Sequence, residues 1–275
     1  MQPLIHLLKH DVVWKDNRVV PKYCEIIGDI IKLYVEWESR MLNCFLDIQH
    51  INIIDDRLDN NVMLSSADQN TKRTCKAQFK VLVTKILHSE NRRPVELTHF
   101  YDMASSDKMN FHNLWHHPLL MASHERYKFP KNALAILGSV SHWIEDYKSY
   151  EKSKYKDERK RNTNIINNIQ SSKHHIAFNY VYVHDKDSYE DNVVGVLNYT
   201  TKIADHLGEH FTKTHPSKLF AHEIEEALTA LFPERLIDLF EFLVVHKNLS
   251  VGTIEAVLLV HFDAPKKSPS SSFAY

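Results

Sequence analysis

Three aspartates close the apolar run of residues 46–60, at Asp55, Asp56 and Asp59. On a helix, residues four apart share a face, so Asp55 and Asp59 would lie one turn apart with Asp56 beside them. Like charges at this spacing repel each other, so a helix gains from collecting them only when a cation binds. Mg²⁺ is commonly held by one or two carboxylates together with substrate phosphates. The spacing therefore indicates a magnesium–diphosphate site, or else a solvated helix end that runs into an Asn-rich loop.

A second polar group, Glu145, Asp146 and Ser149, lies near the end of the apolar periodicity of residues 131–153. Asp146 and Ser149 are three residues apart, so a helix would carry them on one face. A carboxylate and a hydroxyl one turn apart can bind a Mg²⁺ ion that already holds phosphate oxygens. The alternative is an amphipathic helix that ends in a solvated run of charges. Basic residues that could neutralise a diphosphate follow, namely Lys152, Lys154, Lys156, Arg159, Lys160 and Arg161.

Helices are the elements that would position both groups, because the chain is poor in glycine. Five glycines occur in 275 residues, whereas tight hairpins, phosphate-binding loops and dinucleotide folds need glycine for backbone reasons. Apolar residues recur at three- and four-residue steps through most of the chain, which predicts an all-α bundle of about 9–11 helices. We expect helices over residues 22–52 (one or two, the last delivering Asp55), 73–88, 94–104, 131–153, 188–213, 217–231, 233–246 and 250–262.

The segments between these helices carry weaker signals. Pro130 is expected to end any helix before residue 131, since proline removes a helix hydrogen bond. The remaining expectations are a short capping strand or helix over residues 3–9, a polar loop over 57–72, and an extended connector or part of a helix over 174–187.

Composition limits the partners and the compartment. The formal net charge is −1, so no overall field would draw the chain to nucleic acid or to a membrane surface. Apolar runs are too short for an integral membrane segment. Cys24, Cys44 and Cys75 are odd in number and lack metal or redox spacing, which predicts reduced thiols in a cytoplasmic protein. We expect one α-helical domain over residues 1–264 and a disordered Lys/Ser/Pro-rich tail over 265–275.

The two acidic groups together resemble the metal-binding motifs of class I terpene synthases, in the isoprenoid synthase superfamily. Residues 55–59 match the Asp-Asp-x-x-Asp motif, and residues 145–149 look like the Asn-Asp-x-x-Ser motif with glutamate first. The resemblance covers about residues 30–215. The order of later segments is also similar to fungal synthases of the trichodiene synthase kind, in residues 156–159, 164–167, 179–181 and 187–190.

This resemblance implies an isoprenoid-synthase-like fold and Mg²⁺-dependent ionisation and cyclisation of farnesyl or geranyl diphosphate, with release of pyrophosphate. It makes Asp55, Asp56 and Asp146 catalytic, with Lys152 and Arg159 on the diphosphate. Metals and basic residues would stabilise the leaving group, and aromatic faces would stabilise a carbocation. The implied metal ligands are Asp55, Asp56, Asp59, Glu145, Asp146 and Ser149, and the candidate pocket lining is Phe45, Phe100, Trp115 and Trp143.

The chain departs from the family pattern in three respects. The closing glutamate of the second motif falls at Ser153, so Glu151, Asp157 or Glu158 would have to replace it. The interval between the motifs is shorter than in the family. The family's Arg-Tyr pair lies near the C-terminus, whereas Arg126-Tyr127 precedes the second motif.

Three other interpretations remain open from the residues alone. A carboxylate-bridged di-iron bundle could use Asp47 with His50 and Glu96 with His99, because i, i+3 spacing projects two ligands to one side, with Glu38 and Glu223 completing it. A non-enzymatic α-helical interaction or structural protein, for example a viral one, fits the low glycine content, and a homodimer is left open. A histidine cluster could suggest zinc or consist of ordinary core and surface side chains, at His112, His116, His117 and His124.

Overall fold

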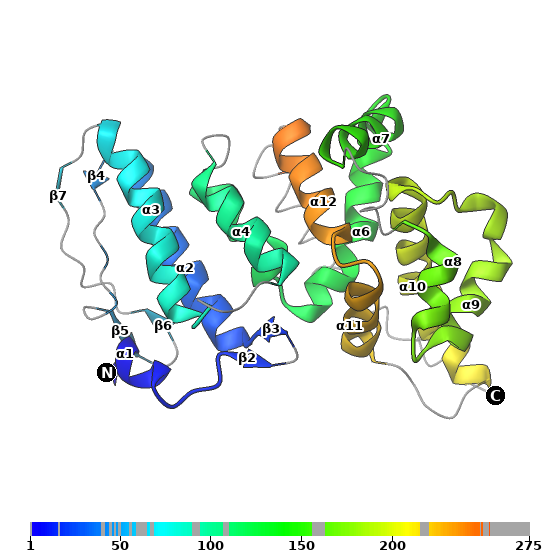
Figure 1. The fold of residues 1–275 in the computed structure, drawn as a ribbon, viewed down its shortest axis with the longest axis horizontal. Coiled ribbons are helices and arrows are strands. Elements are labelled where there is room, and N and C mark those ends of the chain that lie inside the picture. Colours follow the sequence, from blue (N-terminus) through cyan, green and yellow to red (C-terminus); the bar gives the residue numbers. More distant parts are fainter. Residues whose placement is uncertain are drawn as a thin grey trace, which may run out of the picture.

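The computed structural model describes most of the chain as a row of packed helices (Figure 1). The prediction of a mostly α-helical protein is confirmed. The twelve α-helices among the described residues slightly exceed the expected number. The described residues are 2–15, 17–39, 42–43, 46, 48, 51–54, 57–58, 65–66, 69–89, 94–106, 110–155, 163–214, 220–247, 249 and 253.

Short connections join most of the helices from residue 69 onward, whereas residues 40–68 separate the second α-helix from the third. The α-helices are α1 (Leu4–Leu8), α2 (Pro21–Ser39), α3 (Gln69–Ile86), α4 (Val95–Ser105), α5 (Phe111–Trp115), α6 (Ser123–Leu137), α7 (Trp143–Lys154), α8 (Ile165–Ser171), α9 (His175–His184), α10 (Val193–Thr214), α11 (Ala221–Leu231) and α12 (Arg235–Glu241). Two 3₁₀ turns, η2 (Pro118–Leu120) and η4 (Lys186–Ser188), and one π-helical turn, η5 (Phe242–His246), complete the helical elements. None of the described helices combines the length and apolarity that crossing a bilayer requires.

The expectation that helical structure continues from residue 22 to Asp55 is wrong. Helix α2 ends at Ser39, and the next described elements are short strands. Ile51 and Ile53 are buried on either side of Asn52, an alternation that suits a strand rather than a helix. The strands form three small antiparallel sheets: β1 (Gln2–Pro3) with β5 (Asn52–Ile54) and β6 (Arg57–Leu58), β2 (Trp14–Lys15) with β3 (Arg18–Val19), and β4 (Leu42–Asn43) with β7 (Ser65–Ser66).

The single helix expected over residues 131–153 is two helices. Helix α6 starts before Pro130 and includes it. The expectation that this proline ends a helix is therefore wrong. Phe129, Pro130 and Ala133 are buried, and this packing outweighs the loss of one helix hydrogen bond. The break comes later, where α6 ends at Leu137 with Gly138 as its C-cap, and His142 adopts a left-handed conformation with φ 58° before α7 begins.

The remaining boundaries are partly confirmed. Residues 174–187 contain helix α9, so the helical alternative is correct there. Helix α10 begins at Val193 rather than after Ser188, because the side chain of Asn192 accepts hydrogen bonds from the backbone of Val194 and Gly195 at 3.0 Å. The expected helix over residues 250–262, apart from Thr253, and the expected tail over 265–275 lie outside the described residues.

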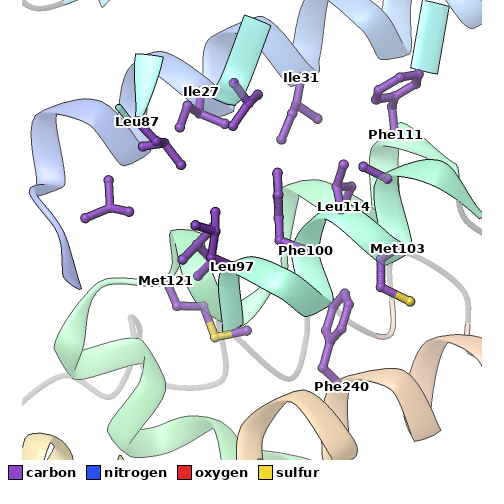
Figure 2. Packing of buried hydrophobic residues seen from close by; sticks show 14 of the residues in the cluster. Ile27, Ile31, Leu87, Leu97, Phe100, Met103, Phe111, Leu114, Met121 and Phe240 are labelled. Carbon is purple, nitrogen blue, oxygen red and sulfur yellow. The ribbon is translucent and has the colours of Figure 1, made fainter. Parts of the chain in front are cut away.

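Two hydrophobic clusters form the core. The larger one gathers residues from α2, α3, α4, α6 and α12, and Figure 2 shows Phe100 of α4 directed toward α2, which carries Ile27, while Phe240 of α12 points toward α4 from the other side. The smaller one lies between α8, α9, α10 and α11. Helix α6 contacts α10, α11 and α12, so it joins the two clusters.

Gly195 is expected to be the glycine least tolerant of a side chain among those with described surroundings. A Cβ atom there would lie 1.8 Å from the backbone oxygen of Glu190, whereas a Cβ at Gly138 would meet its nearest atom at 3.3 Å. Overpacking typically costs about 1–3 kcal/mol. We expect Gly195→Ala to lower the free energy of unfolding in urea by at least this amount and Gly138→Ala to change it by less than about 0.5 kcal/mol. Equal effects would contradict the close approach.

Candidate functional site

The first acidic group cannot be placed on the described structure, because Asp55, Asp56 and Asp59 lie outside the described residues. Their described neighbours form strands, and Ile54 at the end of β5 pairs antiparallel with Arg57 at the start of β6. Figure 1 shows these strands at the end of the molecule that holds the N-terminus. The sequence predicted a helix directly before Asp55, but the segment at that place is strand β5.

The second acidic group lies on α7, where Glu145, Asp146 and Ser149 are all exposed. The carboxylate of Asp146 forms an ion pair with Lys247 rather than standing free for a cation. Lys152 is exposed on the same helix, and Arg159 lies outside the described residues. Two cavities stand out among the described residues, and Glu145, Asp146 and Ser149 line neither of them.

Helix α7 also lies far from the strands that flank the first group. In Figure 1, α4 and α12 stand between β5–β6 and α7 along the longest axis of the molecule. The described residues thus offer no cavity mouth at which the two groups would share magnesium. The terpene synthase hypothesis stays a prediction, with half of its proposed ligands outside the described chain.

Most candidate ligands of the di-iron and zinc interpretations either contact other partners or lie outside the described residues. Glu96 pairs with Arg126, and Glu223 accepts a hydrogen bond from the backbone of Phe220 at the start of α11. His112 and His116 stack on each other. Asp47 and His50 are not described. Among the described residues, no three His, Cys, Asp or Glu side chains form a group that could hold a metal ion.

Of the four aromatic residues expected to line a substrate pocket, one does line a cavity. Phe100 is fully buried in the larger cluster (Figure 2), and Trp143 packs against that cluster. Phe45 lies outside the described residues. Trp115 lines a large cleft, which we call the central cleft.

The central cleft has a volume of about 1380 Å³ and lies between α2 and α11. Its lining includes the apolar segment Leu119, Leu120 and Met121, which lies between α5 and α6. One face of α2 forms a wall, because Glu25, Gly28, Asp29 and Lys32 recur at three- and four-residue steps. The end of α11 and the β2–β3 hairpin also line the cleft. Trp115 fits against α2 because position 28 is glycine, whose absent Cβ would lie 3.3 Å from the indole nitrogen.

A buried network of charges underlies the cleft, and we call it the arginine network: Arg18, Glu96, Arg126, Glu225 and Arg235. Arg126 of α6 forms ion pairs with Glu96 of α4 and with Glu225 of α11, the latter at 2.8 Å. It also donates to the backbone oxygen of Pro118. Arg18 of the hairpin reaches Glu225 at 2.8 Å, so one carboxylate ties three elements around the cleft.

The charges of this network depend on one another. Burial alone would raise the pKa of Glu225, but the surrounding arginines lower this pKa to about 2. Burial would likewise lower the pKa of Arg126, yet Glu96 and Glu225 raise it above its ordinary value. Since both groups stay charged while almost fully buried, removing either one would leave an uncompensated charge in the interior.

A second polar cluster connects α4, α7 and α12, and its core is a chain of hydrogen bonds that we call the histidine relay: Leu119, His117, His99 and Glu241. The backbone N–H of Leu119 donates to Nδ1 of His117 at 3.1 Å. Nε2 of His117 and Nδ1 of His99 are 2.8 Å apart, and Nε2 of His99 lies 3.2 Å from the Glu241 carboxylate.

The direction of every bond in the relay follows from its first donor. A backbone N–H can only donate, so Nδ1 of His117 carries no proton, and neutral His117 carries its proton on Nε2. His117 therefore donates to His99, and His99 donates to Glu241. Burial is the main reason that the pKa of His117 lies well below its ordinary value. Hydrogen bonds from His99, Lys154 and Tyr150 hold the pKa of Glu241 below its ordinary value, although burial opposes this.

Sequence patterns missed both polar clusters. Arg126 and Glu225 are 99 residues apart in the chain, and His99 and Glu241 are 142 apart. No motif connects residues at such separations, since only the packing of α4, α6, α11 and α12 brings them together. The helical spacing of Glu96 and His99 predicts a shared metal ion, but Glu96 pairs with Arg126, and His99 contacts His117 and Glu241.

Comparison with known proteins does not assign the chain to a family. No protein-family model matches the chain, and a search of curated proteins finds no similar sequence.

Proposed function

We propose that this protein is an α-helical interaction protein that binds a short segment of a partner protein in the central cleft. The observation that carries this proposal is the cleft itself, an open groove of about 1380 Å³ with a mostly apolar lining. Pockets for small molecules and cofactors usually measure about 300–1,000 Å³ and enclose most of the ligand. A larger groove that opens to solvent suits an extended or helical segment better than a small metabolite.

The charges on the walls favour a cationic segment with apolar residues. Glu25 of α2 and Glu226 of α11 line the cleft and are exposed, and neither forms an ion pair with any described residue. Lys32 is paired with Asp29 at 3.3 Å and lies over the ring of Trp115. The cationic side chains of Arg18 and Arg126 are already paired with glutamates. The unpaired charges of α2 and α11 are therefore negative, whereas Lys15 of the β2–β3 hairpin is an exposed cation of the cleft lining with no ion pair to a described residue.

The arginine network supports the same function by fixing the walls. Arg18 and Arg126 hold the hairpin, α4, α6 and α11 in one arrangement before any partner binds. A preformed groove spends less binding free energy on ordering its own side chains. The exposed acidic residues of α7 have no comparable network of buried ion pairs around them.

We expect peptides selected from a random library on the purified protein to be rich in Lys and Arg and to bind in the cleft. Titration should shift the indole N–H resonance of Trp115. Ala230→Trp places a bulky side chain at an exposed position of the cleft wall and should weaken binding at least about tenfold, or 1.4 kcal/mol. Val81→Trp on α3 is the matched control, since Val81 is exposed and does not line the cleft.

Two results would contradict the proposal. Selected peptides that bind equally well to both variants would place binding outside the cleft. Pyrophosphate release from farnesyl or geranyl diphosphate that requires Mg²⁺ and is lost in Asp146→Asn would favour the terpene synthase hypothesis instead. Peptides that bind in the cleft but tolerate Glu25→Lys combined with Glu226→Lys would keep the site and remove the charge preference.

A further inference from the structure

A small cavity of about 30 Å³ lies where α6, α7, α10 and α12 meet, and we call it the junction cavity. Its wall includes Pro130 of α6, Tyr147 of α7, Val196 and Thr200 of α10, and Arg235 of α12. Tyr147 belongs to the larger hydrophobic cluster and Val196 to the smaller one. The cavity therefore lies at the boundary between the two parts of the core, and its described lining shares no residue with the central cleft.

Two hydrogen-bond donors of the cavity wall have no partner among the described residues. The side chain of Arg235 is 5% exposed, and no described group accepts a hydrogen bond from its Nε. Tyr147 is 1% exposed, and no described hydrogen bond involves its hydroxyl. Burial, with the carboxylates of Asp238 and Glu151 nearby, raises the pKa of Tyr147 well above its ordinary value, so the hydroxyl keeps its proton. Buried donors without a partner are costly, and native proteins satisfy nearly all of them with protein groups or water.

The same wall offers acceptors that can take further hydrogen bonds. Asp238 is 5% exposed, accepts from the hydroxyl of Tyr155 at 2.8 Å and pairs with Lys154 at 2.9 Å. A carboxylate has about four acceptor positions, so this one has room for another donor. The hydroxyl of Thr200 donates to the backbone oxygen of Leu197 at 3.1 Å, and its oxygen can still accept.

We propose that the junction cavity binds one or two water molecules, which accept hydrogen bonds from Arg235 and Tyr147 and donate to the neighbouring acceptors. A water molecule needs at least roughly 10–15 Å³ of cavity space, and liquid water takes about 30 Å³ per molecule. The volume of the junction cavity therefore suits one or two. Buried water typically makes about three hydrogen bonds to polar groups that lack other partners, and this wall supplies both the donors and the acceptors.

The charges around the cavity disfavour other small ligands. A cation would meet the guanidinium of Arg235, and an anion would meet the carboxylates of Glu151 and Asp238. Within the described part of the chain, no group of three or more His, Cys, Asp or Glu side chains could hold a metal ion. Water is neutral and both donates and accepts, so it suits a wall that carries charges of both signs.

Water at this place joins the two polar clusters of the protein. Arg235 pairs with Glu225 of the arginine network. Asp238 pairs with Lys154, which also pairs with Glu241 of the histidine relay. A bridging water is enthalpically nearly as good as a direct hydrogen bond. The bound water thus extends the arginine network to the histidine relay across the boundary between the two hydrophobic clusters.

Tyr147→Phe tests the site without adding bulk. Where water accepts from the hydroxyl, the change removes a hydrogen bond, and the midpoint of urea unfolding should fall with an unchanged m value. In a dry cavity the hydroxyl has no partner, so its removal would raise the midpoint instead. Tyr199→Phe is the matched reference, because Tyr199 is 0% exposed and its hydroxyl donates to the backbone oxygen of Phe178 at 3.0 Å. We expect both variants to lower the midpoint.

Oxygen-17 magnetic relaxation dispersion of the full chain counts long-lived bound water directly. Val196→Ile adds a methylene group beside the cavity and should lower the count by one or two. Val194→Ile is the matched control, since it makes the same change on the same helix at a position that is 7% exposed and does not line the cavity. It should leave the count unchanged.

Two outcomes would overturn the proposal. Tyr147→Phe could raise the urea midpoint, which would mean that its hydroxyl has no water partner. The count of long-lived waters could be the same in the wild type and in Val196→Ile. Should Val196→Ile fail to fold, the direction of the shift in Tyr147→Phe decides alone. Neither outcome bears on the proposed function, because the central cleft has a different lining.

Discussion

Replacing Arg126 with methionine is expected to lower the free energy of unfolding by about 3–5 kcal/mol, the range found when one partner of a buried ion pair is removed. Arg126 is 2% exposed and pairs with Glu96 and Glu225. Methionine can fill part of the space but leaves Glu225 buried with fewer cations around it. Urea unfolding of the purified variant at neutral pH measures the effect.

A control on the same helix separates burial from charge. Lys131→Met also removes a cation from α6, but Lys131 pairs with Asp205 at the surface, where its side chain is 50% exposed. An exposed pair of this kind contributes about 0–1 kcal/mol. Similar losses in the two variants would mean that the arginine network does not hold the fold together. A loss in Arg126→Met alone would confirm the network as the structural base of the central cleft.

Lowering the pH from 7 to 5 is expected to destabilise the protein through His117. The folded state holds His117 neutral, because burial keeps its pKa well below 6.5. The unfolded state takes up a proton below pH 6.5, so stability is fully present above that pH and is lost as the pH falls. The loss is about 1.4 kcal/mol per pH unit while folded His117 stays neutral.

His117→Gln provides the comparison, since glutamine can still accept from Leu119 and donate to His99 but does not titrate. Its stability should fall less steeply than that of the wild type between pH 7 and 5. Equal slopes would assign the loss to other histidines. A further decline is expected in stronger acid, because the Glu225 pKa of about 2 lies below its ordinary 4.5. That contribution is present above pH 4.5 and is lost as the pH falls toward 2.

Arg126 and His117 differ in their position relative to the central cleft. Arg126 also lines the cleft, so a destabilised variant is expected to bind selected peptides less tightly even where the fold survives. His117 is fully buried and lies outside the cleft lining. Loss of stability in His117→Gln without loss of peptide binding would show that the relay supports the core rather than the site.

The sequence by itself determined where most helices lie. Ile26, Ile30 and Tyr34 of α2 are buried as their periodicity predicts, and α4 begins directly after Pro94. These features depend on residues that are close in sequence. Proline, for example, restricts the backbone where it stands and so marks the start of α4. The spacing of apolar residues therefore carried the helical fold class, although it misplaced the break between α6 and α7.

Only the tertiary structure decided the candidate site. Residues 51–54 resemble the end of a helix when the sequence is read locally. In the structure, Asn52 and Ile53 pair with Pro3 and Gln2, which lie far away in the sequence. The carboxylate of Glu225 finds Arg18 across 207 residues of sequence. Such contacts depend on how helices pack, because a buried charge is tolerated only where partners arrive from other elements. Local spacing records which face of a helix is apolar, whereas packing decides which charges meet and where a groove stays open.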